Sequence, residues 1–324
     1  MSESDKHHDC TGHDIPSQSG RVAVVTGANS GLGYETALAL AAAGGEVVVA
    51  ARNAEKGQRA VERIRAAHPR ASVLFEALDL ASLDSVADFA GRMTARGGRV
   101  DLLVNNAGLA APPRRMTTTD GFELQFGTNY LGHFALTARL LPLLFGAREP
   151  RVVTVSSVVH KGGHIDFEDL QYERRRYSPA NAYRQSKLAN LLFAFELQQR
   201  SEKGGWGLMS VAAHPGMART ELVANGPGLN SLSGRLFSIA VKPFFTQSVA
   251  DGALPILFAA TSPAAMKGGY YGPSRLFEFV GPPTIAKVAK RARDVEVGRK
   301  LWDVSEALVG IGFDQAASGH GQHR

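Results

Sequence analysis

From residue 21 onward, short apolar segments alternate with longer segments of mixed polar and apolar character. The six apolar segments are RVAVVTG (21–27), EVVVAA (46–51), SVLFEA (72–77), VDLLVNN (100–106), RVVTVSS (151–157) and GLMSVAAH (207–214). Nearly continuous runs of Val, Leu and Ala are typical of parallel strands buried on both faces. The segments between them, such as YETALALAAAG (34–44), are typical of helices. This alternation predicts an α/β fold: a single Rossmann-type, doubly wound parallel sheet of about seven strands with helices on both faces.

Neither an internal repeat nor an interdomain linker interrupts this alternation, which predicts one domain over about residues 20–313. Residues 1–19 and 314–324 are polar and rich in Ser, Gly and His, so we expect disordered tails. The N-terminal tail contains His7, His8 and Cys10, but their spacing matches no structural zinc pattern. We therefore predict no metal site.

Composition and charge exclude several classes of protein. The chain has 324 residues and a formal net charge of +6, with scattered basic residues whose densest run is Arg174–Arg176. This distribution argues against a nucleic-acid partner and implies a mild attraction for anionic ligands such as nucleotide phosphates. A single cysteine excludes an intrachain disulfide and is compatible with a reducing compartment.

The sequence shows no signal peptide and no apolar stretch long enough to cross a membrane. The nearest candidate, residues 236–260, is interrupted by Lys242, Pro243, Asp251 and Pro255. We expect this segment to form helices that line a pocket or an interface. The sequence therefore predicts a cytoplasmic protein without a membrane anchor.

A glycine-rich turn follows the first predicted strand. The sequence TGANSGLG (26–33) leads from that strand into a helix, with Gly27, Gly31 and Gly33 at the turn. Glycine allows the backbone to approach a pyrophosphate, and the free N–H groups of the helix N-terminus bind its charge. The pattern predicts a dinucleotide site; a tight turn without a ligand is the alternative.

The end of the second predicted strand indicates which dinucleotide is bound. NAD-binding proteins usually place an acidic residue here, about 20 positions after the glycines, to bind the ribose hydroxyls. This chain has Ala51 followed by Arg52. A guanidinium pairs with a 2′-phosphate, whereas a carboxylate would repel it. We therefore predict NADP(H) rather than NAD(H), the alternative being that Arg52 is an ordinary surface residue.

Four further motifs follow in a fixed order: NNAG (105–108), the Ser pair 156–157, Tyr-x-x-x-Lys (183–187) and HPG (214–216). On a helix, residues four apart share a face, so Tyr183 and Lys187 lie together. With the glycine-rich turn, this ordered set resembles the short-chain dehydrogenase/reductase family over about residues 15–312. The segments TNYLGHFALT (128–137) and AYRQSKLANLLFAFEL (182–197) are similar to its retinol dehydrogenase and WW-domain oxidoreductase branch.

The resemblance implies a catalytic set of four residues. Tyr183 is the acid/base that protonates the carbonyl oxygen, and Lys187 lowers the pKa of the phenol and binds the nicotinamide ribose. Ser157, rather than Ser156, hydrogen-bonds the substrate oxygen and stabilises its developing charge. Asn129 kinks a helix and holds a water for proton relay.

The resemblance also implies a larger set of cofactor contacts. These residues lie in the glycine-rich turn, after the second and third strands, in NNAG and in the segment after HPG. They are Gly27, Asn29, Ser30, Gly31, Leu32, Gly33, Arg52, Asp79, Leu80, Asn105, Ala107, Gly108, Tyr183, Lys187, Pro215, Gly216 and Thr220.

The substrate is less well specified than the reaction. An insertion at 160–180 and an apolar segment at 217–250 are expected to form the pocket, which favours a hydrophobic ketone, aldehyde or alcohol. The apolar segment is equally compatible with core or subunit packing, so a homo-oligomer remains open. Arg114, Arg115 and Arg174–Arg176 could face an anionic substrate, although a solvated rim is the favoured interpretation.

Three functions remain in competition. The leading one is an NADP(H)-dependent oxidoreductase that interconverts a carbonyl and an alcohol, operating as a reductase. A C=C reductase of the protochlorophyllide-reductase type shares Tyr-x-x-x-Lys. A non-catalytic nucleotide-binding regulator is disfavoured because Asn129, Ser157, Tyr183 and Lys187 are all present.

Overall fold

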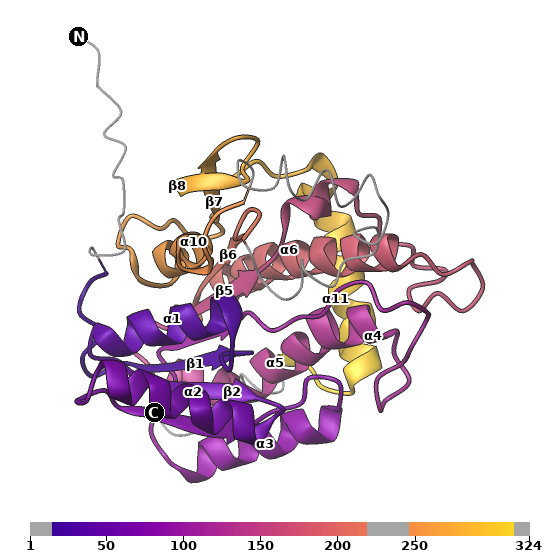
Figure 1. Cartoon of the computed structure of the whole chain (residues 1–324). Helices are drawn as coiled ribbons and strands as arrows, with labels where there is room; N and C mark the ends of the chain where they lie inside the picture. The colour runs from indigo at the N-terminus through magenta and orange to yellow at the C-terminus, as the bar shows by residue number, and fades with distance from the viewer. Residues whose placement is uncertain (1–14, 219–245, 314–324) are drawn as a thin grey trace.

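The computed structural model describes residues 15–218 and 246–313, whose strands form one twisted sheet (Figure 1). Its order is β3-β2-β1-β4-β5-β6-β7-β8, and every neighbouring pair except β7 and β8 is parallel. The strands are β1 (Val22–Thr26), β2 (Glu46–Ala51), β3 (Val73–Ala77), β4 (Leu102–Asn105), β5 (Arg151–Val155), β6 (Met209–Ala213), β7 (Tyr270–Arg275) and β8 (Val280–Ile285). The predicted doubly wound parallel sheet is confirmed.

The sheet of the described residues has eight strands, one more than expected. The first six correspond to the six apolar segments, whereas β7 and β8 contain Pro273, Pro282 and Pro283 and do not have an apolar strand pattern. Proline removes a ladder donor and is tolerated at a sheet edge. β8 is such an edge strand and is the antiparallel one.

Helices cover both faces of the sheet (Figure 1). On one face lie α1 (Gly31–Ala42), α2 (Ala54–Ala67) and α10 (Val249–Thr261). On the other lie α3 (Leu83–Ala95), α5 (Gly132–Phe145), α6 (Pro179–Gly204) and α11 (Val295–Val309). Alternate residues of each central strand enter opposite cores: Val24 packs on the α5 side and Val25 on the α1 side.

The strand order reverses between β1 and β4, which are paired neighbours with parallel register. Ligands of open α/β sheets bind at the carboxyl ends of strands where the order reverses. Thr26 ends β1 and Asn105 ends β4, so the glycine-rich turn and the NNAG segment meet at this point.

α6, which is 26 residues long, carries the Tyr-x-x-x-Lys motif, and residues at its two ends explain where it begins and stops. The Ser178 side chain accepts a hydrogen bond from the Asn181 N–H at its N-terminus, and Pro179 occupies the first turn. Gly205, with φ of 64°, ends the helix in the left-handed conformation that glycine tolerates. Tyr183 therefore lies in the first turns of the helix.

The insertion at 160–180 begins with a 3₁₀ turn, η2 (Val158–Gly162), and continues as an irregular loop. Asp169 holds this loop by accepting hydrogen bonds from the backbone N–H groups of Glu173 and Arg175 at 2.7 and 3.0 Å. The Arg175 guanidinium lies 3.8 Å from the centre of the Tyr172 ring and donates to Asp166 and Gln185. The loop is therefore fastened to the start of α6 by its own side chains.

Candidate active site

The glycine-rich turn joins β1 to α1. Gly31 has a φ of 58°, and a Cβ at this position would meet no atom within 4 Å. A Cβ on Gly33, in contrast, would approach the Gly27 carbonyl oxygen to 2.5 Å, so only glycine permits the close contact of helix and strand. The turn is therefore tightly packed at Gly33 and has free space beside Gly31.

The N-terminus of α1 fits a bound phosphate. The side chain of Ser30, the N-cap residue, makes no capping hydrogen bond, and the first turn of α1 contains no acidic residue. In α2, α3, α6, α10 and α11 the N-cap side chain does accept such a bond. The first N–H groups of α1 therefore lack a side-chain partner, as expected where a pyrophosphate supplies the acceptor.

The NNAG segment is tied to β1 through the Thr26 hydroxyl. This oxygen accepts hydrogen bonds from the N–H groups of Asn106 and Ala107, both at 2.9 Å. Asn105 donates from Nδ2 to the Thr137 hydroxyl at 3.0 Å. Asn106 Oδ1 is buried without a hydrogen-bond partner among residues 15–218 and 246–313, which leaves an acceptor for a ligand beside the turn.

Three predicted adenosine contacts lie at the ends of β2 and β3. Arg52 follows β2 directly and is exposed, and its guanidinium has no ion pair with any described residue. Asp79 Oδ1 accepts from the Ala81 N–H at 2.9 Å. The Leu80 side chain is only 6% exposed and belongs to the core, so its backbone is the part available to a cofactor.

Tyr183, Ser157 and Lys187 converge at the carboxyl end of β5. The Ser157 hydroxyl is a hydrogen-bond partner of the Tyr183 phenol. Lys187 Nζ lies 5.7 Å from the centre of the Tyr183 ring and donates to the Val155 carbonyl oxygen at 3.1 Å. Ser156, in contrast, donates to the Lys187 carbonyl at 2.7 Å and is buried. The structure thus places Ser157, and not Ser156, next to the phenol.

The pKa values differ from the expectation that Lys187 acidifies the phenol. Desolvation raises the pKa of Tyr183 to about 12, and the hydrogen bond from Ser157 opposes this only in part. Burial also lowers the pKa of Lys187 to about 8. Desolvation therefore outweighs the expected effect of Lys187 alone, so the phenol is protonated at neutral pH and carries the proton that a carbonyl oxygen would accept, while the lowering of its pKa by Lys187 together with an oxidised nicotinamide stays a prediction.

Asn129 lies in a π-helical turn, η1 (Gly127–Leu131), between the single turn α4 (Leu124–Phe126) and α5. The expected helix distortion at this residue is therefore present. Its side chain accepts from the Leu109 N–H at 2.8 Å and donates to the Leu109 carbonyl and the Ser186 hydroxyl at 2.9 and 3.0 Å. Ser186 Oγ in turn donates to the Tyr183 carbonyl at 2.9 Å.

Gly108 shows how closely these groups approach. A Cβ on Gly108 would lie 3.2 Å from Asn129 Oδ1 and 3.6 Å from Lys187 Nζ. The NNAG backbone therefore passes close to both the asparagine amide and the lysine ammonium. The four predicted catalytic residues therefore lie together, next to the glycine-rich turn.

The segment after β6 is described as far as residue 218. Pro215 accepts from Gln247 Nε2 at 2.9 Å, and Gly216 has a φ of 63° with Phe279 O only 2.3 Å from an added Cβ. Thr220 and most of the apolar segment 217–250 lie outside the described residues. Its last two residues, Val249 and Ala250, begin α10 and are half-buried and exposed, respectively.

Sequence reasoning missed two buried polar residues of this region. His133, in α5, contacts both Thr26 and Asn129, and Ser186 links Asn129 to α6. The spacing of His133 four residues after Asn129 was a usable signal, because residues four apart share a helix face.

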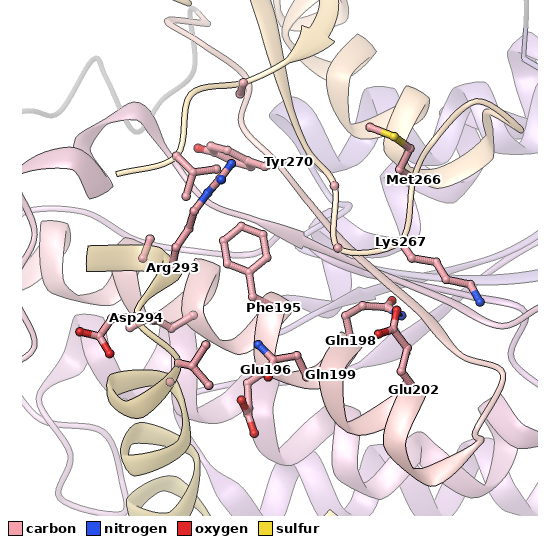
Figure 2. Close-up of a pocket in the computed structure, with 18 of the residues that line it drawn as sticks. Phe195, Glu196, Gln198, Gln199, Glu202, Met266, Lys267, Tyr270, Arg293 and Asp294 are labelled. Carbon is pink, nitrogen blue, oxygen red and sulfur yellow. Dashed lines mark hydrogen bonds between the residues drawn. The ribbon is translucent and has the colours of Figure 1, made fainter. Parts of the chain in front are cut away.

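A cavity of about 460 Å³ lies elsewhere on α6 (Figure 2). Residues of the second half of α6, including Phe195 and Glu196, line one side, and Arg293 and Asp294 ahead of α11 line another. Leu192 is the lining residue nearest to Tyr183 along the helix, nine positions away, or about 13 Å at 1.5 Å per residue. This cavity is separate from the catalytic set.

The described part of the chain has neither a membrane-spanning helix nor a cluster of metal ligands. Within these residues, no helix is both long and apolar enough to cross a membrane. No group of three His, Cys, Asp or Glu residues there could hold a metal ion. The histidines of the N-terminal tail lie outside the described residues.

The chain is similar to known proteins over most of its length. Residues 21–227 match the family model described as short chain dehydrogenase. Retinol dehydrogenase 13 of Mus musculus is 40% identical over 307 residues, which cover 93% of this chain and 87% of that protein. Polyprenol dehydrogenase of Mus musculus is 41% identical over 303 residues, which cover 92% and 86%. A crystal structure of an uncharacterized protein from Mycobacterium Paratuberculosis has a TM-score of 0.78 and 40% identity, covering 94% of this chain and 99% of that one.

Proposed function

Since this chain belongs to the short-chain dehydrogenase family of oxidoreductases, we propose that it interconverts a carbonyl and an alcohol on a hydrophobic small molecule with NADP(H). The observation that carries the proposal is the convergence of Tyr183, Ser157, Lys187 and Asn129 beside an open glycine-rich turn.

In this proposal the nicotinamide, when bound, supplies the hydride to the carbonyl carbon. Tyr183 transfers its phenolic proton to the carbonyl oxygen, so that the C=O bond becomes CH–OH and the phenolate is left on the enzyme. Ser157 donates a hydrogen bond to the same oxygen while its charge develops. Lys187 stabilises the phenolate by its charge, and bulk solvent finally reprotonates Tyr183.

The protonated phenol supports carbonyl reduction as the favoured direction. Because burial raises the pKa of Tyr183 to about 12, the residue holds a proton at neutral pH. A general acid must hold its proton when the substrate binds. Alcohol oxidation would instead require the phenolate, which bound oxidised cofactor and Lys187 would have to stabilise.

Arg52 supports NADP(H) as the cofactor. It follows Ala51, the last residue of β2, which stands where an acidic residue would bind the ribose hydroxyls of NAD(H). Its guanidinium is exposed and has no ion-pair partner within residues 15–218 and 246–313, so it is available to a 2′-phosphate.

The substrate class rests on the relatives and on the composition of the chain. Two relatives are named for retinol and polyprenol, both of which are long apolar alcohols. The apolar residues at 217–250 are compatible with a pocket for such molecules. We propose an apolar aldehyde or ketone as substrate, without assigning a retinoid. Reduction of a C=C bond is the second candidate, because it uses the same Tyr and Lys.

The substitution Tyr183→Phe tests this function. It removes the phenolic proton and keeps the ring, so we expect turnover with apolar carbonyls to fall at least about a hundredfold. NADPH affinity, measured by fluorescence titration, should change little. With an α,β-unsaturated carbonyl as substrate, product analysis by NMR distinguishes the allylic alcohol from the isomeric saturated carbonyl. Undiminished turnover by the Phe variant would remove Tyr183 from its role and contradict the proposal.

A further inference from the structure

His133 lies between the glycine-rich turn that follows β1, here called the cofactor turn, and the π-helical turn η1, which contains Asn129. It is the second residue of α5 and is only 1% exposed. Its Nδ1 lies 2.9 Å from the Asn129 carbonyl oxygen, and its Nε2 lies 2.9 Å from the Thr26 hydroxyl. One imidazole ring therefore joins the last residue of β1 to η1.

The two contacts of the ring define its protonation state. A carbonyl oxygen only accepts hydrogen bonds, so Nδ1 must carry the proton that binds Asn129. Burial, with a smaller contribution from the Lys187 charge, lowers the pKa of His133 to about 4, against the opposing effect of the Asn129 carbonyl. The ring is therefore neutral at pH 7, and Nε2 is an acceptor.

The Thr26 hydroxyl completes this arrangement. Its oxygen already accepts from the N–H groups of Asn106 and Ala107, which leaves its proton to donate. His133 Nε2 at 2.9 Å is a closer acceptor than the Val104 carbonyl at 3.3 Å. The chain of hydrogen bonds thus runs in one direction, from Thr26 to His133 to the Asn129 backbone.

The π-helical geometry explains why Asn129 needs such support. In η1 the Gly132 N–H donates to the Gly127 carbonyl, five residues back, instead of following the α-helical pattern. Such turns are less regular than an α-helix and are frequent at functional sites. The Asn129 side chain meanwhile connects Leu109 to Ser186 and so to Tyr183.

We propose that His133 is a positioning residue: its neutral Nδ1–H tautomer, to which Thr26 donates at Nε2, fixes the backbone of the catalytic asparagine, Asn129. This inference rests on the proposed function of Asn129 and Tyr183. Catalytic groups displaced by about 1 Å can lose roughly a hundredfold in rate. The imidazole is expected to contribute to turnover through this geometry, and not by contact with substrate.

Three substitutions separate the two nitrogen contacts. The amide nitrogen of His133→Asn stands as many bonds from Cα as Nδ1, so it can still donate to Asn129. The amide of His133→Gln corresponds to Nε2 and retains only the Thr26 contact. His133→Phe retains the ring without either contact. We expect kcat to fall roughly tenfold to a hundredfold in the Gln and Phe variants and to be largely rescued in the Asn variant, with KM and NADPH affinity unchanged.

Ser305→Ala is a matched control for lost stability. The Ser305 hydroxyl hydrogen-bonds the Tyr130 phenol at 2.7 Å, so this change removes a buried contact of η1 without touching the Asn129 carbonyl. It should lower Tm as the His133 variants do and leave kcat unchanged. If kcat of the Gln and Phe variants is no lower than that of Ser305→Ala, or if the Asn variant is as slow as the Phe variant, the proposal is overturned.

A readout without substrate separates this proposal from the proposed function. In protein with ¹⁵N-labelled histidine, the His133 ring should show a protonated Nδ1, an unprotonated Nε2 and no titration between pH 5.5 and pH 9. A protonated Nε2, or titration near pH 6.5, would overturn the assignment even in an inactive protein. Turnover that survives Tyr183→Phe would instead contradict the function and leave this geometry intact.

Discussion

At the scale of single residues, burial rather than charge controls the catalytic pair. Lys187 is 4% exposed and its ammonium donates to the Val155 carbonyl instead of to the phenol. Desolvation therefore acts on both groups, raising the pKa of Tyr183 and lowering the pKa of Lys187. Desolvation thus favours the neutral form of both the Tyr183 phenol and the Lys187 amine. A bound cofactor would change this balance by bringing charge into the site.

This balance predicts how NADPH binding depends on pH. Lys187 has a pKa lowered to about 8, so its cation is present below pH 8 and is lost above it. If the ammonium binds the nicotinamide ribose, the Kd for NADPH should rise about tenfold between pH 7 and pH 9.5. Fluorescence titration across this range measures the effect.

Lys187→Met is the control for this measurement. The variant should bind NADPH more weakly than wild type at pH 7 and show no further loss at pH 9.5. The nearby groups do not titrate in this window, since the pKa of Tyr183 is raised to about 12 and that of His133 is lowered to about 4. A pH dependence that persists in the Met variant would exclude Lys187 as its source.

The sequence predicted which residues lie together at the candidate site but not their protonation. The spacing of four positions placed Tyr183 and Lys187 on one face of a helix, and the structure places Ser157 and Asn129 beside them. The upward shift of the Tyr183 pKa could not be predicted because desolvation depends on what packs around the ring, which spacing does not reveal. His133 was missed because its partner Thr26 lies 107 positions away in the sequence.

At the scale of elements, the insertion at 160–180 is a loop held by its own hydrogen bonds and ion pairs rather than a cluster of free cations. The two terminal guanidinium nitrogens of Arg175 donate to Asp166, Asp169 and Gln185, and the group stacks on the Tyr172 ring. Arg115 donates to the Gln171 carbonyl at 2.8 Å and holds the same loop from the other side. These two arginines therefore act within the protein, and an anionic substrate is not needed to explain them.

Arg175→Ala tests this interpretation, with Arg176→Ala as its matched control. Arg176 is exposed and makes no ion pair with any residue that the structure describes. We expect Arg175→Ala to increase limited proteolysis within the 160–180 loop. If this loop borders the substrate pocket, as the sequence predicts, KM should also rise several-fold, because a less ordered loop positions the substrate poorly. Arg176→Ala should change neither quantity. Equal effects of the two substitutions would indicate a shared role for the arginines in binding an anionic substrate.

The elements that sequence reasoning missed share a physical cause. The strands β1, β2, β4, β5 and β6 are buried on both faces, and this burial gives the apolar runs that predicted them, while the edge strand β3 is half-buried over most of its length. In contrast, β7 ends in exposed residues and β8 is an edge strand with two adjacent prolines. Neither strand needs the apolar pattern on which the prediction relied.

At the scale of the whole molecule, the order of the strands assembles the site. The neighbouring strands β1, β4 and β5 end at Thr26, Asn105 and Val155. The cofactor turn, the NNAG segment and the Ser pair, which follow these strands, therefore meet at the carboxyl ends of the sheet. The alternation of segments along the sequence was sufficient to predict this arrangement, because parallel connections of this kind follow strict rules of handedness. No comparable rule fixes the conformation of the loops expected to bind substrate, so the sequence could not predict the identity of the substrate.

The most direct test of this account is the initial rate of NADPH and, separately, NADH oxidation by the purified protein with apolar aldehydes and ketones. The account predicts consumption of NADPH at a rate well above that of NADH, with formation of the alcohol, and a ratio that shifts toward NADH in Arg52→Asp. Equal use of both cofactors, or a ratio that Arg52→Asp leaves unchanged, would contradict the cofactor assignment. Tight NADPH binding without reduction of any carbonyl would contradict the proposed reaction.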